Sequence, residues 1–124
     1  MNSDQHQITI AEAAALTLNW RRNRPPGSFD AGMFDKAAFD RLFAQEGCTG
    51  IRIYMGWHLE SDPVHSKDPS RWTFVMVGTD KDGNDITSKP GTVAMTTADD
   101  GDAEQNPWVC PPVCASPGPL NTPP

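Results

Sequence analysis

Hydrophobic side chains recur every three or four positions near the start of the chain, which is the period of an amphipathic helix. Thr9 and Glu12 have the spacing of a capping box, so this helix is expected to begin after Thr9. Pro25 and the residues after it would end the helix, which places its last residue at about Asn23. The apolar stripe consists of Ala13, Leu16, Thr17 and Trp20, with Ile10 and Ala14 beside it.

A second helix is predicted over residues 35–45, because apolar side chains again fall on one helical face. Those side chains are Ala38, Phe39, Leu42 and Phe43. Gly47 follows closely and is expected to be the left-handed C-cap of this helix, since glycine adopts that conformation without the steric cost of a Cβ atom.

The period then changes to two, which predicts strands. Residues 50–57 place four apolar side chains on one face of a half-buried strand: Ile51, Ile53, Met55 and Trp57. Residues 72–78 are apolar at nearly every position, as in a central strand covered on both faces. Between them, residues 60–71 would be a long exposed loop, and residues 80–85 predict a turn before a short third strand at 86–88. The order predicts an α+β fold, with two N-terminal helices followed by a small antiparallel meander of two or three strands.

Composition separates the C-terminal third from the rest. Hydrophobic residues make up only 37% of the 124 residues, and eight of the twelve prolines lie between Lys89 and the C-terminus. The acidic run 99–104 lies in the same region. Such chain buries too little apolar area to offset the entropy lost on ordering. We therefore expect a small α+β domain at 1–88, an irregular acidic linker at 89–106, and an irregular Pro- and Cys-rich tail at 107–124.

Charge and hydropathy restrict the classes of partner. Sixteen acidic and ten basic side chains give a net charge of −6, which argues against a surface for nucleic acid. No stretch has the roughly 18–20 consecutive apolar residues that span a bilayer. Residues 1–7 lack the basic and apolar regions of a secretory signal. These features predict a cytoplasmic protein without a membrane span.

Part of the zinc-deaminase signature is present, as His58 and Glu60 followed later by Cys110 and Cys114. The signature requires two residues between its cysteines, whereas this chain has three. Two of those three are proline, which prevents the helix that would present the pair. The deaminase interpretation is therefore not favoured.

A less specific hypothesis is a structural zinc site, formed by Cys48, Cys110, Cys114 and either His58 or His65. A small redox protein that uses the same three cysteines is the related alternative. Cys110 and Cys114 are near enough to form a disulfide, although a reducing cytoplasm would leave such a bond transient or absent. Otherwise the three thiols are simply reduced, and no cofactor is implied.

Two other motifs offer weaker chemistry. The segment 80–85 has part of the calcium-loop pattern but lacks the flanking acids, so an ordinary hairpin turn is favoured. An unfamiliar enzyme site around Arg52, His58 and Glu60 is a further alternative, since Arg52 and His58 share a strand face by parity. No nucleophile elbow or phosphate-binding loop accompanies them, so no catalytic residue is assigned.

The tail contains an apolar segment among its prolines, and this segment indicates binding. Proline-rich chain adopts the polyproline II conformation and docks on aromatic-lined grooves at low entropic cost. The expected contact residues are Trp108, Val109, Pro111, Pro112 and Val113, with Tyr54 and Trp57 helping to line a groove. The tail could wrap its own domain or dock on another chain. The sequence thus predicts a non-enzymatic binding or assembly module, either a homo-oligomer or an accessory subunit of a larger complex.

Overall fold

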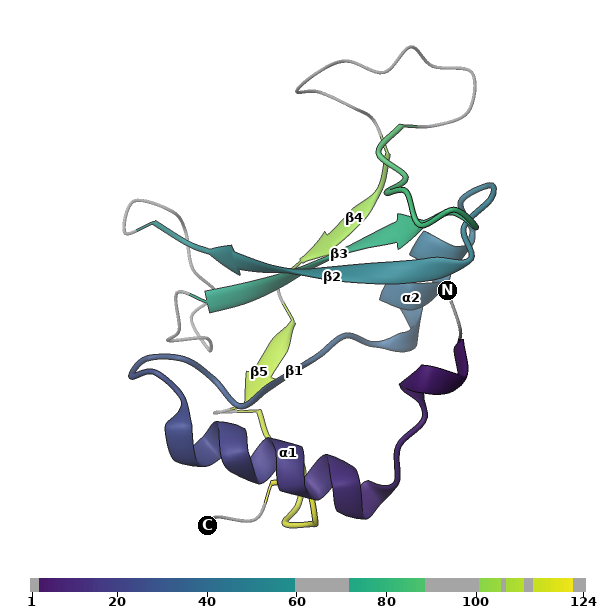
Figure 1. Cartoon of the computed structure of the whole chain (residues 1–124). Helices are drawn as coiled ribbons and strands as arrows, with labels where there is room; N and C mark the ends of the chain where they lie inside the picture. The colour runs from purple at the N-terminus through teal and green to yellow at the C-terminus, as the bar shows by residue number, and fades with distance from the viewer. Residues whose placement is uncertain (1–2, 60–71, 89–100, 106, 111–112, 122–124) are drawn as a thin grey trace.

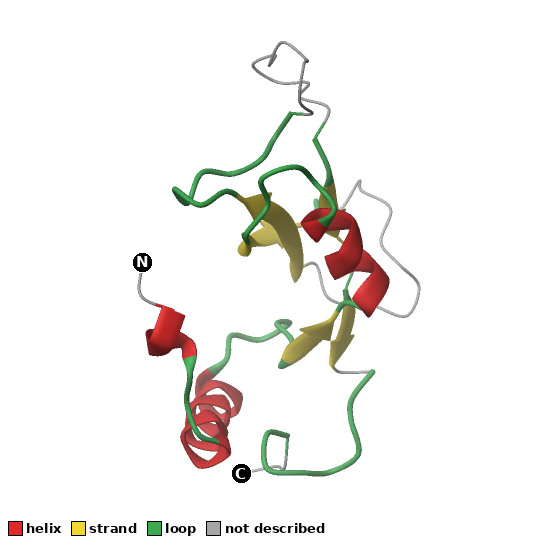
Figure 2. Ribbon diagram, turned by 90° about the vertical axis from the view of Figure 1, so that its right-hand side faces the viewer, coloured by secondary structure: helices red, strands yellow, loops and turns green. Residues whose placement is uncertain are grey.

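A computed structural model describes residues 3–59, 72–88, 101–105, 107–110 and 113–121 of the chain. The fold is α+β, as predicted, with two α-helices and five antiparallel strands in two small sheets. The three-stranded sheet has the order β2-β3-β4, and the two-stranded sheet pairs β1 with β5. The two-stranded sheet lies between helix α1 and the three-stranded sheet (Figures 1 and 2).

Helix α1, Ile10–Asn23, follows a short 3-10 turn at Ser3–His6 and begins as predicted. Thr9 caps it, because its Oγ1 atom accepts a hydrogen bond from the Glu12 amide at 3.0 Å and the Glu12 carboxylate accepts from the Thr9 amide at 3.3 Å. The predicted apolar stripe, however, does not form a core: α1 has no buried residue, and Leu16 is 61% exposed. The helix is therefore stabilised locally at its N-terminus more than by packing of its stripe.

Helix α2, Lys36–Phe43, is two residues shorter than predicted at its C-terminal end. Asp35 is its N-cap and accepts a hydrogen bond from the Ala38 amide at 3.2 Å. The prediction that Gly47 is the C-cap is wrong: the cap is Ala44, in the right-handed region, because its amide still bonds carbonyls of the last turn. Gly47 does have a left-handed φ of 79°, but in the turn that follows.

The main core lies between α2 and the three-stranded sheet. Strands β2, Gly50–Trp57, and β3, Trp72–Thr79, pair antiparallel along their full lengths, with Ile53 opposite Met76. Met76 and Leu42 are fully buried with Ala38, and Phe34, Phe39 and Ile51 pack around them. Strand β3 is central, as predicted.

The third strand of this sheet is not the one that was predicted. Residues 86–88 form no strand, and only Asp85 makes an isolated bridge, to Thr79. The third position is taken by β4, Ala103–Gln105, which pairs with Val75–Val77 of β3 and comes from the range interpreted as a linker. Glu104 anchors this strand through an ion pair with Arg41 of α2. The hydrogen bond that Arg41 donates to Glu104 also raises the pKa of the Arg41 guanidinium.

The second sheet was not predicted at all. Strand β1, Ala31–Met33, follows the loop after α1 and pairs antiparallel with β5, Trp108–Cys110. Gly32 allows this sheet to approach β3, since a Cβ atom there would lie 2.9 Å from the Phe74 ring and 3.0 Å from Pro107 Cβ. Segments from the C-terminal third thus complete both sheets, while the three-part division at residues 88 and 106 stays a prediction.

Candidate functional site

The C-terminal arm, defined here as the described residues 107–110 and 113–121, lies on its own chain in this structure. Val109 is 1% exposed, and Pro107 and Cys110 are also buried. The Cys110 carbonyl accepts a hydrogen bond from the Asp30 amide at 2.6 Å, which extends the pairing of β5 with β1. The strand pleat turns the Trp108 side chain to the face opposite Val109, and Trp108 is 45% exposed there.

Beyond β5 the arm turns back toward α1. A disulfide joins Cys110 to Cys114, and the Val113 amide donates to the Val109 carbonyl at 2.8 Å. Arg21 of α1 donates a hydrogen bond to the Leu120 carbonyl. An apolar groove of about 700 Å³ lies between α1, β1 and the arm. Pro111 and Pro112 lie outside the described residues, so their predicted contacts stay predictions.

The second feature is a surface on β2. Ile53, Met55 and Trp57 share a face, and they are 58%, 59% and 60% exposed. We call these three residues the β2 apolar face. The prediction that this face is half-buried holds only for Ile51, which packs against the core. Helix α2 and the β1–β5 sheet cover the neighbouring row on β3, where Met76 is buried, but they leave the row on β2 uncovered.

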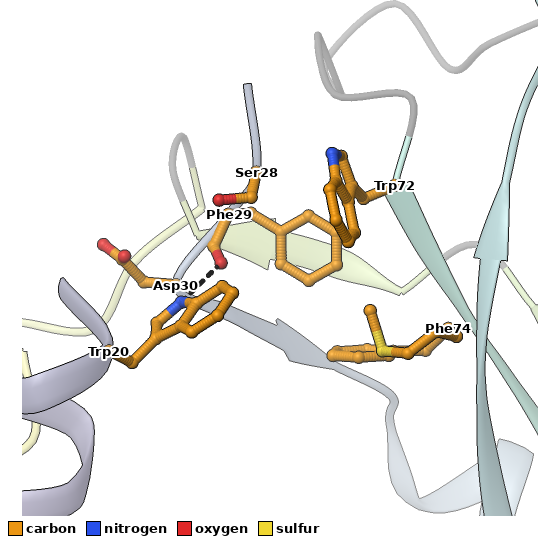
Figure 3. Close-up of a pocket in the computed structure, with 7 residues that line it drawn as sticks. Trp20, Ser28, Phe29, Asp30, Trp72 and Phe74 are labelled. Carbon is orange, nitrogen blue, oxygen red and sulfur yellow. Dashed lines mark hydrogen bonds between the residues drawn. The ribbon is translucent and has the colours of Figure 1, made fainter. Parts of the chain in front are cut away.

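Met55, the middle residue of this face, lines an aromatic pocket of about 200 Å³ (Figure 3). Phe29 and Phe74 meet edge to face with ring centroids 5.1 Å apart. The Trp20 Nε1 atom donates to the Phe29 carbonyl at 3.0 Å, which holds the end of α1 beside the pocket. Met55 and Trp72 complete the apolar lining. Sequence reasoning missed Phe29 and Phe74, although the parity of Phe74 with Met76 does place both on one face.

Tyr54 and Trp57, both predicted to bind a partner, point to opposite faces of β2. The Tyr54 hydroxyl donates to the Asp85 carboxylate, which also pairs with Arg52. The hydrogen bond to Asp85 raises the pKa of Tyr54, and the same carboxylate raises the pKa of the Arg52 guanidinium. Trp57 instead contacts Trp72, with ring centroids 5.3 Å apart. The two residues therefore do not line one common groove.

The residues of the zinc hypothesis are not gathered. The Cys48 thiol is free and donates to the Gly50 carbonyl at 3.3 Å, whereas Cys110 and Cys114 bond each other. His58 lies at the end of β2, with its Nε2 atom 3.1 Å from the Gln105 side chain. Among the described residues no three His, Cys, Asp or Glu side chains form a metal-binding group. His65 lies outside the described residues.

The remaining motifs behave as local structure. Asp80 accepts hydrogen bonds from the Asp82 and Asn84 amides at 2.9 and 3.0 Å, and Gly83 has a φ of 84°, so segment 80–85 is the turn that was predicted. The hydrogen bond from Asn84 lowers the pKa of Asp80.

The proposed enzyme residues are likewise dispersed along β2. Arg52 is held by Asp85 and Gly83, whereas His58 is six residues further on, about 20 Å along an extended strand. Glu60 lies outside the described residues. The described residues of this set therefore do not converge.

Comparisons of the chain with protein-family models, with curated proteins and with solved structures give no match. Within the described residues, no helix has both the length and the apolar character needed to cross a membrane. The two features of the candidate site are thus an arm that packs on its own chain and an exposed apolar face on β2.

Proposed function

We propose that this protein is a non-enzymatic binding or assembly module that presents the β2 apolar face to another protein. The observation that carries this proposal is the exposure of Ile53, Met55 and Trp57, each more than half exposed on one strand. Scattered exposed apolar residues are ordinary, but a contiguous row beside a concave aromatic pocket is typical of a protein–protein contact. The net charge of −6 favours a protein partner over nucleic acid.

In this proposal the C-terminal arm is a clamp as well as a contact surface. Val109 faces its own chain and supports β1, whereas Trp108, 45% exposed, and Val113, 44% exposed, are available to a partner. We propose that Pro111 and Pro112 belong to the same contact surface. The partner is a second copy of this chain or the body of a larger complex, to which this protein is an accessory subunit.

The proposed location is the cytoplasm, and the Cys110–Cys114 disulfide makes that part of the proposal testable. Cytoplasmic thiols are kept reduced, so both cysteines should be free in protein taken from its native cell. A stable disulfide there would instead favour an oxidising compartment.

The apolar dye bis-ANS tests whether the surface is open in the folded chain. Dye fluorescence should rise with native protein and fall by half or more in the Met55→Ser variant. The matched control is Phe43→Ser, since Phe43 is 50% exposed but belongs to the end of α2 and not to strand β2. Equal dye binding by both variants, with their circular dichroism unchanged, would remove the β2 apolar face as the binding surface.

A redox role is the second candidate, and only the disulfide favours it over the binding role. A redox-active pair exchanges with the glutathione pool, whereas structural disulfides resist it. Equilibration in glutathione buffers, followed by alkylation and mass measurement, separates the two roles. A bond that stays fully oxidised across the buffers excludes the redox role.

A further inference from the structure

In the part of the chain that the structure describes, strand β2 forms one edge of its sheet. Among the described strands it pairs with β3 alone, on one side, and it lies outermost in the sheet (Figure 1). It is eight residues long and contains no proline. Its one charged residue, Arg52, is already paired with Asp85. Native proteins usually protect a long edge with lysine, proline or a bulge, because unpaired backbone groups template pairing with another strand.

We infer that this edge binds a second copy of the same chain, with β2 pairing antiparallel to β2 of the partner subunit. The inference rests on the proposed function and names its partner. Two-fold symmetry makes one edge complementary to itself, since each copy supplies the same donors and acceptors in opposite directions. The two three-stranded sheets would then join into one continuous sheet.

The side chains select the register. The two-fold axis passes beside Tyr54, so that Tyr54 faces its own equivalent. Ile53 then lies opposite Met55 of the partner subunit, and Ile51 lies opposite Trp57 of the partner subunit. A shift of one residue would place each apolar side chain opposite a side chain of the other face, and a shift of the axis to Ile53 would set Trp57 against Thr49. The axis at Tyr54 therefore pairs the four apolar residues with one another inside β2, whereas an axis at Met55 would set Ile51 against Leu59, beyond the end of the strand.

Charge is compatible with this register. Arg52 lies opposite Gly56 of the partner subunit, so the two guanidinium groups are four residues apart along the strands, about 13 Å. That separation exceeds the Debye length of roughly 8 Å at physiological salt. Each Arg52 also keeps Asp85 as its counter-charge.

The buried area is that of a small interface. Ile53, Tyr54, Met55 and Trp57 are 44–60% exposed, and cross-strand neighbours would cover the flanks of these side chains while the rest of each face stays open. The total area therefore falls below the roughly 1,200 Å² of a standard interface. Backbone pairing along the edge adds to this area. An interface of that size belongs to a weak dimer, so association should depend on concentration in the micromolar range.

Sedimentation equilibrium of the full chain tests the inference, over concentrations from about 1 µM to about 300 µM. The mass should rise from 13.5 kDa toward twice that value. Ile53→Lys should raise the dissociation constant at least tenfold, because it places a charge on the joined face. Phe43→Lys is the matched control and should leave the constant unchanged. A monomer at every concentration, or equal constants for the two variants, would overturn the inference.

Disulfide trapping tests the register in a Cys48→Ser background. Residues facing each other across the axis have Cα atoms about 5 Å apart, which is within the range for a disulfide. Oxidised glutathione should therefore cross-link Tyr54→Cys into a dimer and leave Arg52→Cys monomeric. Efficient cross-linking of Arg52→Cys alone would exclude this register. A chain that binds bis-ANS at the β2 apolar face yet stays monomeric would keep the proposed function and refute the second copy as its partner.

Discussion

Truncation of Val109 to alanine is the sharpest test of how the C-terminal arm is bound. Val109 is 1% exposed in β5, opposite Gly32 of β1. If the arm closes on its own chain, this side chain is part of the folded core. If the arm instead docks only on other molecules, its truncation should leave the isolated chain almost unchanged.

The expected loss follows from the atoms removed. Val109→Ala deletes two buried methyl groups, each contributing about 0.8 kcal/mol of transfer free energy. The residual cavity adds a further fraction, so the free energy of unfolding should fall by about 2 kcal/mol. Val113→Ala removes the same atoms from a residue of the same arm that is 44% exposed, and it should cost less than about 0.5 kcal/mol.

Urea unfolding followed by tryptophan fluorescence measures the difference. With a slope of about 1–3 kcal/mol per molar urea, Val109→Ala should lower the midpoint by about 1 M. The shift should be the same at low and high protein concentration, because contacts within one chain do not depend on concentration. Equal midpoints for the two valine variants would refute the wrapped arm. A shift that grows with protein concentration would show that the arm is bound by another copy.

Three further predictions concern local contacts. Tyr54 is the chain's one tyrosine, so its near-ultraviolet titration should give a pKa above 10.0, and Asp85→Asn should bring it down. Because folding raises that pKa, the hydrogen bond contributes its full stabilisation of the fold below pH 10.0, and this contribution is lost as the pH rises through the pKa of the folded protein. An unchanged midpoint of the tyrosine titration in Asp85→Asn would contradict the hydrogen bond. Thr9→Ala should cost about 1 kcal/mol of helix stability by circular dichroism, and Thr9→Asn far less, whereas equal losses would argue against the cap. Alkylation without reduction, followed by intact mass, should add one label to oxidised protein and three if the bond between Cys110 and Cys114 is open; three labels in air-oxidised protein would contradict the disulfide.

The elements that sequence predicted well are those specified by nearby residues. The capping box at Thr9 places the start of α1, and the cap at Asp35 places the start of α2, because each bond spans three residues. The strands predicted at 50–57 and 72–78 came from alternation and from a continuous apolar run, and the second extends one residue further, to Thr79. The turn at Asp80 was found from its Asp and Gly residues.

The elements that sequence missed depend on partners far along the chain. Strands β1 and β5 have three residues each, too few for a period, and they exist because Gly32 and Val109 meet across 77 positions. Strand β4 likewise comes from an acidic segment and is held by β3 and Arg41. This more distant segment, and not the short strand predicted at 86–88, pairs with β3 as the third strand of the sheet.

The candidate site, too, was predicted only in part from the sequence. The sequence identified the apolar segment around Trp108, but only β-pairing shows which of its side chains is buried, because the pleat sends alternate residues to opposite faces. It also grouped Cys48 with Cys110 in a metal set, whereas the structure keeps them apart. The distance between Cys48 and the two tail cysteines is set only when the chain is folded.

The sequence by itself determined which residues of β2 share a face, since alternation is a property of the extended backbone. Whether that face is covered was decided only by the tertiary structure, through the reach of α2 and of the sheet formed by β1 and β5. These layers bury Met76 on β3 and stop before Ile53 on β2. The same hydrophobic alternation is therefore found in a buried strand and in its exposed neighbour. Alternation shows to which face of the sheet a side chain points, whereas burial depends on whether another element packs on that face.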